Sequence, residues 1–297
     1  MSLIALLLLT LSAVAHASWN LFGKRAGQAG VTFYSLTTVA TATVSLPFLI
    51  YFGRWFIELP SFFWLLVCAT GIAQGVYFIG LAGTYQHGAF GLSYPLARAL
   101  PVLLVPLGSA IFLNGEPDSI AICGMVIVVI AMLSLVRIHH SESSQVIAIV
   151  YAVIAALGTV AYSLIDYHAL QRLQGWYPHE PKWHLMLFYA SCEAWATMIF
   201  LACIFFSKIQ RIKLRNTYQI HAKTAFLAGV MMFITYALVL LSYMLVTNVS
   251  YAVAFRQLSI PIGVFLGVVF LHEKISLRGV FSNIFLLLGL VMIVINS

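Results

Sequence analysis

The stretch SYPLARALPVLLVPLGSAIFLNGE, residues 93–116, recurs later in the chain as SYAVAFRQLSIPIGVFLGVVFLHE, residues 250–273. A shift of 157 aligns the two copies and pairs their first serine, first tyrosine and final glutamate. The alignment extends through residues 136 and 293, and apolar residues pair with apolar residues for almost its whole length. The chain therefore contains an internal repeat, which decides the fold we expect.

The composition of the chain is that of a membrane protein. Its residues are 62% hydrophobic and only 8% charged, whereas soluble domains carry roughly 25% charged residues. The net charge of +7 is spread over short connectors, so it bears on membrane orientation and argues against nucleic-acid binding. The four cysteines stand singly in apolar runs without a CxxC pair, and we interpret them as small core residues.

Ten segments are long and apolar enough to cross a bilayer, whose core of roughly 30 Å needs about 20 residues of helix. The first segment contains a core like that of a signal peptide, but no basic region precedes it, so we interpret it as an uncleaved span. The expected spans are residues 2–22, 31–52, 62–83, 90–113, 119–137, 145–167, 184–206, 222–245, 250–271 and 277–295.

These spans form two groups of five, which predicts two repeat domains at residues 1–140 and 141–297. An odd number of spans per repeat makes the two copies enter the membrane from opposite sides. We therefore expect an all-α polytopic membrane protein with ten transmembrane helices in two inverted five-helix repeats. Proteins of this build are typically transporters that bind their solute where the repeats meet.

The connectors carry an uneven distribution of charge. Most lysines and arginines follow odd-numbered spans, and many of them lie in an expected loop at residues 208–223. The positive-inside rule then places both termini outside the cytoplasm. A second long loop is expected at residues 171–182.

Two arginines lie well inside expected spans, where a charge costs at least about 2.5–3.5 kcal/mol. Arg98 follows Tyr94 by one helical turn, so the two share a face, whereas Arg256 and Tyr251 do not. A guanidinium binds a carboxylate or a phosphate with two hydrogen bonds. We therefore name all four as candidate solute-binding residues. The alternative is that each arginine snorkels or ties its helix to a carbonyl or an acid of a neighbouring helix.

Three titratable side chains in the spans are candidates for proton coupling. Glu193 lies near the middle of its span and could exchange a proton with one side of the membrane at a time; the alternative is a static ion pair with an arginine. Asp166 shares a polar stripe with Tyr162, but it lies close to the expected helix end, which favours a solvated interfacial acid. His16 is either a third proton site or a hydrogen-bonded packing residue.

Aromatic and polar side chains supply further candidate walls for a binding site. Trp19 and Asn20 extend the polar stripe of His16, although Trp19 could equally belong to an interfacial aromatic belt. Tyr77 and Tyr236 occupy corresponding positions in the two repeats. A polar stripe on a membrane helix should face protein or a water-filled cavity.

Prolines and glycines predict kinks and close helix contacts. Three prolines fall in the span 90–113, and Pro261 falls in the span 250–271, so both helices should kink. The GxxxG patterns at Gly71–Gly75 and Gly263–Gly267 permit close packing.

The sequence resembles the drug/metabolite transporter superfamily, and specifically its transporters with two EamA domains. The resemblance covers nearly the whole chain and rests on AHASWNLFGKR at residues 15–25, YPLAR at residues 94–98, and the short exits at residues 115–116 and 272–274. The amino-acid sequence of the first motif also resembles that of a subgroup associated with phosphonate utilisation. The resemblance implies alternating access through a central cavity lined by helices 1, 3, 4, 6, 8 and 9, with helices 5 and 10 peripheral. It also implies cytoplasmic termini, opposite to the orientation that the charges favour.

We therefore expect a secondary transporter that moves a small polar or anionic metabolite such as a carboxylate or phosphonate; the resemblance implies an exporter. It is expected to be a multi-pass protein of the inner (plasma) membrane, embedded in the lipid bilayer. The chain has no HExxH, GxSxG or P-loop pattern, so we expect neither an enzyme nor a metal or other cofactor. The alternative function is a membrane enzyme or lipid-handling protein acting on a lipid head group. The sequence does not name the solute, the coupling ion or the oligomeric state.

Overall fold

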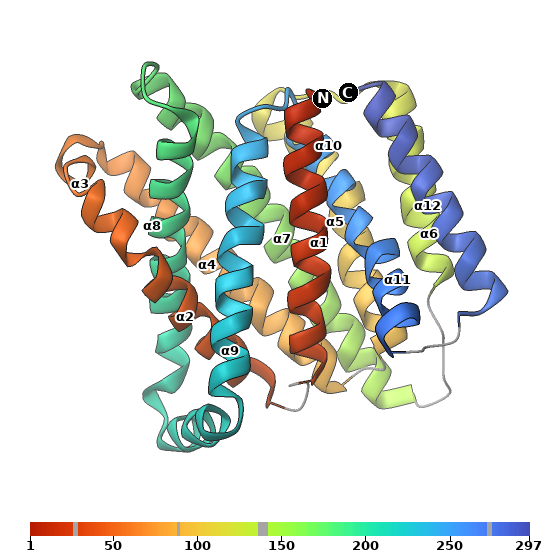
Figure 1. Ribbon diagram of the computed structural model, residues 1–297, viewed down its shortest axis with the longest axis horizontal. Coiled ribbons are helices and arrows are strands. Elements are labelled where there is room, and N and C mark those ends of the chain that lie inside the picture. Colours follow the sequence, from red (N-terminus) through yellow and green to blue (C-terminus); the bar gives the residue numbers. More distant parts are fainter. Residues whose placement is uncertain (26–28, 88–89, 136–141, 272–274) are drawn as a thin grey trace.

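The computed structural model describes residues 1–25, 29–87, 90–135, 142–271 and 275–297, and these residues contain helices and no strand (Figure 1). The helices are α1 Leu3–Arg25, α2 Gly30–Tyr51, α3 Trp55–Glu58, α4 Ser61–His87, α5 Phe90–Leu113, α6 Ser119–Ser134, α7 Glu142–Trp176, α8 Lys182–Ala202, η2 Cys203–Phe206, α9 Lys208–Tyr243, α10 Val249–Phe255, η3 Arg256–Leu258, α11 Ser259–Leu271 and α12 Leu277–Ile295.

The apolar helices fit a membrane protein. Within the described ranges, six helices are long and apolar enough to cross a membrane, namely α2, α4, α7, α8, α9 and α12, with α7 and α8 counted over residues 146–176 and 182–205. Shorter apolar helical stretches occupy Leu3–Ala17, Ala97–Leu113, Ser119–Ser134 and Val249–Phe265. The all-helical class predicted from the sequence is thus confirmed, and each of the ten expected segments coincides with helix.

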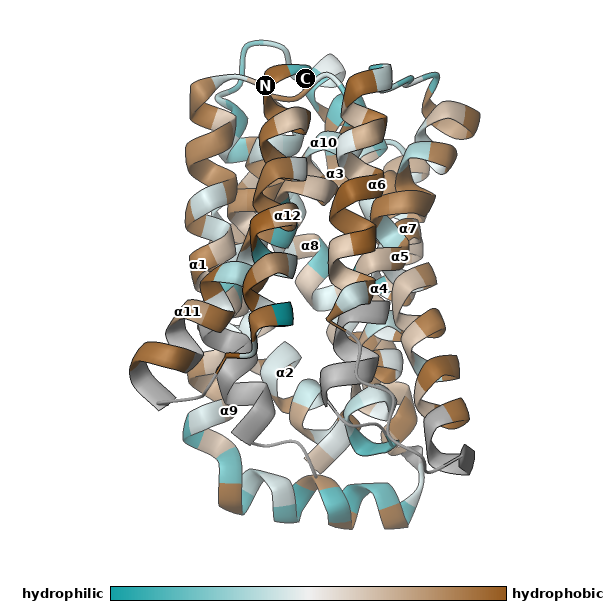
Figure 2. Ribbon diagram, turned by 90° about the vertical axis from the view of Figure 1, so that its right-hand side faces the viewer, coloured by the Kyte–Doolittle hydropathy of each residue, from teal (hydrophilic) through white to brown (hydrophobic). Residues whose placement is uncertain are grey.

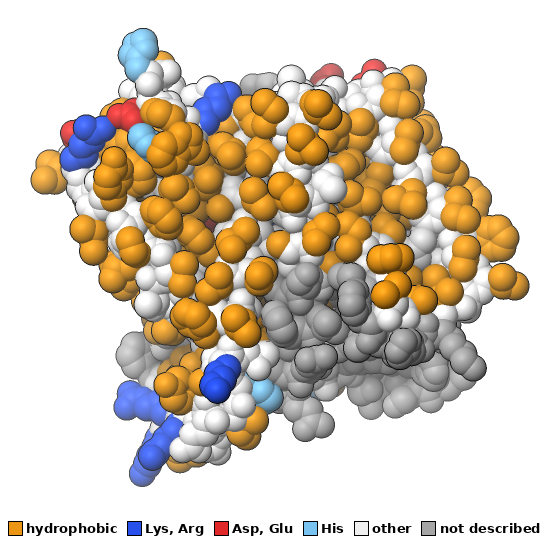
Figure 3. All heavy atoms as spheres, viewed as in Figure 1, with side chains coloured by type: hydrophobic (Ala, Val, Ile, Leu, Met, Phe, Trp, Pro, Cys, Tyr) orange, Lys and Arg blue, Asp and Glu red, His pale blue; other side chains and the backbone are white. Residues whose placement is uncertain are grey.

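Apolar side chains also cover the outside of the bundle. Ile50, Leu65 and Ile111 are strongly exposed, and orange apolar side chains dominate the face drawn in Figure 3. The interior holds many threonines, serines and alanines in place of a purely apolar core. An outer surface this apolar is suited to lipid contact and would be an aggregation hazard in water.

Small residues set how closely the helices pack. A Cβ added at Gly71 would lie 2.5 Å from the Cβ of Ala196 in α8, and one at Gly229 would lie 2.6 Å from the Cβ of Ala40 in α2. A Cβ added at Gly75 would lie 2.0 Å from the ring of Phe200. The first GxxxG pattern therefore makes the close contact predicted for it. At Gly263 an added Cβ would meet no described atom within 4 Å.

The bundle is built from a small number of extensive helix contacts. The largest pairs are α4 with α7, α6 with α12, α2 with α9, α1 with α9, α5 with α7, α2 with α8, α4 with α8 and, less extensively, α5 with α6. Both termini lie at one end of the bundle (Figure 1), where the Met1 ammonium donates to Ser297 Oγ at 2.8 Å.

Two segments expected to be loops are mostly helical. α7 continues to Trp176, well beyond the predicted end at residue 167, and the α7–α8 connector is only residues 177–181. Tyr177 in that connector donates to Glu58 at 3.1 Å; burial and this hydrogen bond raise the pKa of Tyr177 to about 12. The basic stretch expected as a loop at residues 208–223 is instead the start of α9, which lies across the end of the bundle away from the termini (Figures 1 and 2).

Candidate functional site

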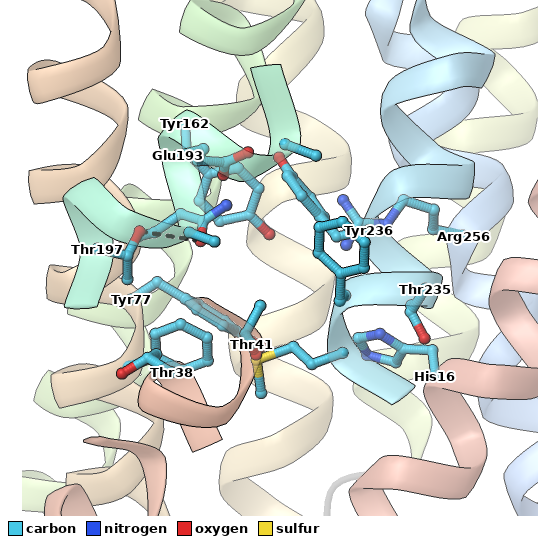
Figure 4. A pocket seen from close by; sticks show the side chains of 16 residues that line it. His16, Thr38, Thr41, Tyr77, Tyr162, Glu193, Thr197, Thr235, Tyr236 and Arg256 are labelled. Atoms are coloured by element: carbon cyan, nitrogen blue, oxygen red, sulfur yellow. Dashed lines mark hydrogen bonds between the residues drawn. The ribbon is translucent and has the colours of Figure 1, made fainter. Parts of the chain in front are cut away.

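A cavity lies inside the bundle, between residues of both halves of the chain (Figure 4). About 660 Å³ of space not filled by protein atoms, including space open to solvent, lies between its walls. Its polar and aromatic walls come from α1, α2, α4, α7, α8, α9 and η3 and comprise His16, Thr38, Thr41, Gln74, Tyr77, Tyr162, Glu193, Thr197, Thr235, Tyr236 and Arg256.

Three tyrosines form a continuous aromatic wall. The ring of Tyr162 makes edge contacts with Tyr77, at a centroid distance of 5.8 Å, and with Tyr236, at 5.7 Å. The guanidinium carbon of Arg256 lies 5.7 Å from the centroid of the Tyr236 ring. This geometry allows a cation–π interaction that stabilises the buried arginine.

Arg256 lies at a break in its helix. The expected ninth span is divided into α10, η3 and α11, and Arg256 is the first residue of η3. Pro261 has no N–H for the carbonyl of Gln257, four residues earlier, and its ring crowds that carbonyl, which favours a kink or a break at this point. Arg256 is only 8% exposed and lines the cavity.

Arg98 holds this break in place. Its guanidinium donates to Gln257 Oε1 at 3.0 Å, to Ser259 Oγ at 2.8 Å and to the Arg256 carbonyl at 3.3 Å. It also lies 2.6 Å from Nε2 of His16; because arginine has no acceptor, this ring nitrogen accepts the bond. Arg98 is not among the cavity-lining residues, and the structure favours the helix-tying interpretation for it. His16 is both a packing partner of Arg98 and part of the cavity wall.

Glu193 differs from every other charged group in the cavity. It is 1% exposed, lines the cavity, and neither of its carboxylate oxygens has a hydrogen-bond partner among the described residues. The static ion pair with Arg98 or Arg256 is therefore not formed in this structure. An ionised carboxylate buried without a partner is strongly unfavourable, and a proton or a bound cationic group removes that penalty.

Asp166 is fully buried, so the expectation of a solvated interfacial acid is wrong. The reason is the length of α7, which continues for more than two turns beyond Asp166. Its carboxylate accepts hydrogen bonds from the hydroxyls of Thr70, Tyr189 and Tyr236, the second at 2.7 Å. Asp166 thus supports the cavity wall from behind, through Tyr236.

The remaining predicted site residues lie in different places. Tyr77 lines the cavity. The hydroxyl of Tyr251 accepts from the backbone N–H of Asp118 at 3.1 Å, and its ring packs in a separate apolar cluster with α6 and α12. Trp19, Asn20 and Tyr94 lie in helices, but their side chains are outside the described part of the chain.

The lining differs in part from the set of helices implied by the family resemblance. Helices α2 and α8, the second and seventh expected spans, contribute to the walls, whereas no described side chain of α5 does. Sequence reasoning missed Thr38 and Thr41. The signal was the dense run of serines and threonines in α2, where Thr41 Oγ1 bonds to the Gly229 carbonyl of α9 at 3.0 Å.

Comparisons with known proteins identify the fold and nothing finer. No family model and no curated protein matches the chain. The chain is similar to a solved structure described only as the crystal structure of a protein, with a TM-score of 0.66, 15% identity, and coverage of 97% of this chain and 95% of that one. At this identity the match shows a shared fold over nearly the full length. Within the described ranges, no three His, Cys, Asp or Glu side chains form a group that could hold a metal ion.

Proposed function

We propose that the chain is a secondary transporter, related to the EamA transporters of the drug/metabolite superfamily, that carries a small polar or anionic metabolite through the central cavity. The proposal depends on the presence in one cavity of Arg256 and of Glu193, whose carboxylate has no hydrogen-bond partner among the described residues. Buried ionisable residues at membrane depth are costly and usually mark a solute or proton path.

The proposal includes ten spans in two inverted repeats, at residues 1–140 and 141–297. In the proposed repeats, each helix of one half corresponds to a helix of the other half. The contact of α4 with α7 then corresponds to the contact of α9 with α1, and the contact of α2 with α9 corresponds to that of α8 with α4. Likewise, the close approach of Gly71 to Ala196 corresponds to the close approach of Gly229 to Ala40, and the residue numbers agree with the shift of 157 to within one residue. The adjacent termini support an even number of crossings.

In the proposed mechanism, Arg256 binds the anionic group of the solute, and the tyrosine wall contacts its remaining surface. Glu193 takes up or releases a proton as the cavity opens to one side or the other, which couples solute movement to the proton gradient. Asp166 is the second candidate proton site, because Tyr236 links it to the cavity. The chain acts without covalent chemistry, in the inner membrane.

A thermal-shift screen of purified protein tests solute binding, because a ligand that binds the native state raises its apparent stability. The panel contains acetate, succinate, inorganic phosphate and methylphosphonate. At least one anion should raise the melting temperature of the unmodified protein and of Arg172→Gln, an exposed control, but not that of Arg256→Gln. Equal shifts in Arg256→Gln and the control would remove Arg256 from the binding site.

A further inference from the structure

The first turns of α9 form a basic surface that the cavity does not use. Lys208, Arg211, Lys213 and Arg215 are all exposed, and blue Lys and Arg side chains gather at this end of the molecule in Figure 3. No aspartate or glutamate occurs in the sequence between Glu193 and Glu273. The charges of this segment are therefore not balanced by acids nearby in the chain.

Charge placement makes this segment unfavourable on its own. The N-terminus of a helix carries the positive end of the helix dipole, where cationic side chains are destabilising. Lys208 is the first residue of α9, and the N-cap residue Ser207 makes no side-chain capping bond. An anion bound at this end of the helix would offset the unfavourable interaction of the lysine with the helix dipole and would take the place of the missing cap.

The position of the segment is fixed by its inner face. Thr217 is buried and its hydroxyl lies 2.7 Å from that of Thr32 in α2, and the His221 ring makes an edge contact with Phe33. The outer face also exposes Ile209, Ile212 and Ile220 beside the basic residues. The segment lies across the end of an apolar bundle (Figures 1 and 2), as a helix at a membrane interface does.

We propose that residues 208–223 of α9, the basic helix, bind the head groups of anionic phospholipids at the surface of the membrane. The basic side chains contact phosphate groups, and the exposed isoleucines insert among the upper acyl chains. Each lysine or arginine near an anionic surface strengthens binding by about fivefold. Lipid binding by the basic helix depends on the apolar bundle and not on the proposed transport function. It would still be expected if the cavity carried no solute.

The test uses full-length protein in a neutral detergent and counts bound lipids by native mass spectrometry. Phosphatidylglycerol and phosphatidylcholine are titrated separately, and glycerol phosphate is added in a third arm to represent a free phosphate. The test variant is Lys213→Gln/Arg215→Gln, which leaves Arg211 bonded to the Phe205 carbonyl. The matched control, Arg172→Gln/Arg278→Gln, removes the same charge from exposed positions elsewhere.

We expect the unmodified protein and the control to retain phosphatidylglycerol over phosphatidylcholine, and the test variant to bind it at least tenfold more weakly. Lys213→Arg/Arg215→Lys, which keeps the charge, should bind as the unmodified protein does. Equal retention of the two lipids, or an equal loss in the control, overturns the proposal. Full competition by glycerol phosphate at the same concentration as the lipid also overturns it, because the surface would then bind free phosphate.

Discussion

Arg256 lines the cavity at a break in its helix shortly before Pro261, and Arg98 bonds to Gln257 and Ser259 of the same segment. Two arginines that look equivalent in the sequence therefore have different surroundings, one facing the cavity and one tying helices. Glu193 faces the same cavity without a hydrogen-bond partner among the described residues. The local sequence predicts that these charges need partners, but which helix supplies a partner depends on packing across the bundle.

Glu193→Gln tests proton coupling at a single residue. Glutamine keeps the shape of the side chain but cannot release a proton, so solute-driven proton movement should fall at least tenfold while solute binding persists. The measurement is the change in luminal pH of proteoliposomes, read with a pH-sensitive dye after solute is added. Undiminished proton movement in this variant would exclude Glu193 as the coupling group.

Asp166→Asn tests a structural role behind the cavity. Asp166 accepts from three hydroxyls, and hydrogen bonds to a charged group contribute about 1.5–3 kcal/mol each. We expect the substitution to destabilise the protein by about 2 kcal/mol or more, measured as a lower melting temperature in detergent. Tyr189→Phe removes one donor and should have a smaller effect; a larger effect would contradict this account.

At the level of whole helices, the hydrophobic periods predicted the all-helical class but misjudged several helix ends. α7 ends at Trp176 because polar residues such as Gln171 can still bond within the fold, in this case to the Tyr243 carbonyl at 3.2 Å. The basic start of α9 was expected to be a loop because charge ended the apolar run. Thr38 and Thr41 were missed although the run of serines and threonines in α2 was a signal. Their hydroxyls bond to backbone carbonyls of the same helix, so the run alone does not show which of its residues face a cavity.

Gly71→Ala tests the close contact between α4 and α8. The added methyl group would lie 2.5 Å from Ala196 Cβ and 2.8 Å from its backbone carbon, and such overpacking typically costs about 1–3 kcal/mol. Gly263→Ala is the matched control, since an added Cβ meets no described atom within 4 Å there. We expect a lower melting temperature in detergent for the first variant and little change for the second; equal melting temperatures would contradict the packing.

For the whole molecule, the termini and the basic helix lie at opposite ends of the bundle (Figure 1). The charges place the basic helix in the cytoplasm by the positive-inside rule, whereas the family resemblance implies cytoplasmic termini. The even, inverted arrangement that the repeat in the sequence predicts stays a proposal. The asymmetry between Arg98 and Arg256 is the feature that the repeat does not predict.

Cysteine labelling tests this arrangement across the membrane. In a variant whose four native cysteines are replaced by alanine, Ser2→Cys and Arg215→Cys should react with an impermeant reagent from opposite sides of sealed vesicles. Ser297→Cys serves as the control and should follow Ser2→Cys, because both termini lie at one end. Labelling of Ser2→Cys and Arg215→Cys from the same side would contradict the bundle's orientation across the bilayer.

The most direct test of the cavity as a solute path is electrical. Proteoliposomes on a solid-supported membrane are switched rapidly into acetate, succinate, inorganic phosphate or methylphosphonate, and the charge displaced is recorded. We expect a saturable current with at least one of these anions in the unmodified protein and in Arg172→Gln, reduced at least tenfold in Arg256→Gln. The same current in Arg256→Gln as in the unmodified protein would contradict passage of the anion through this cavity.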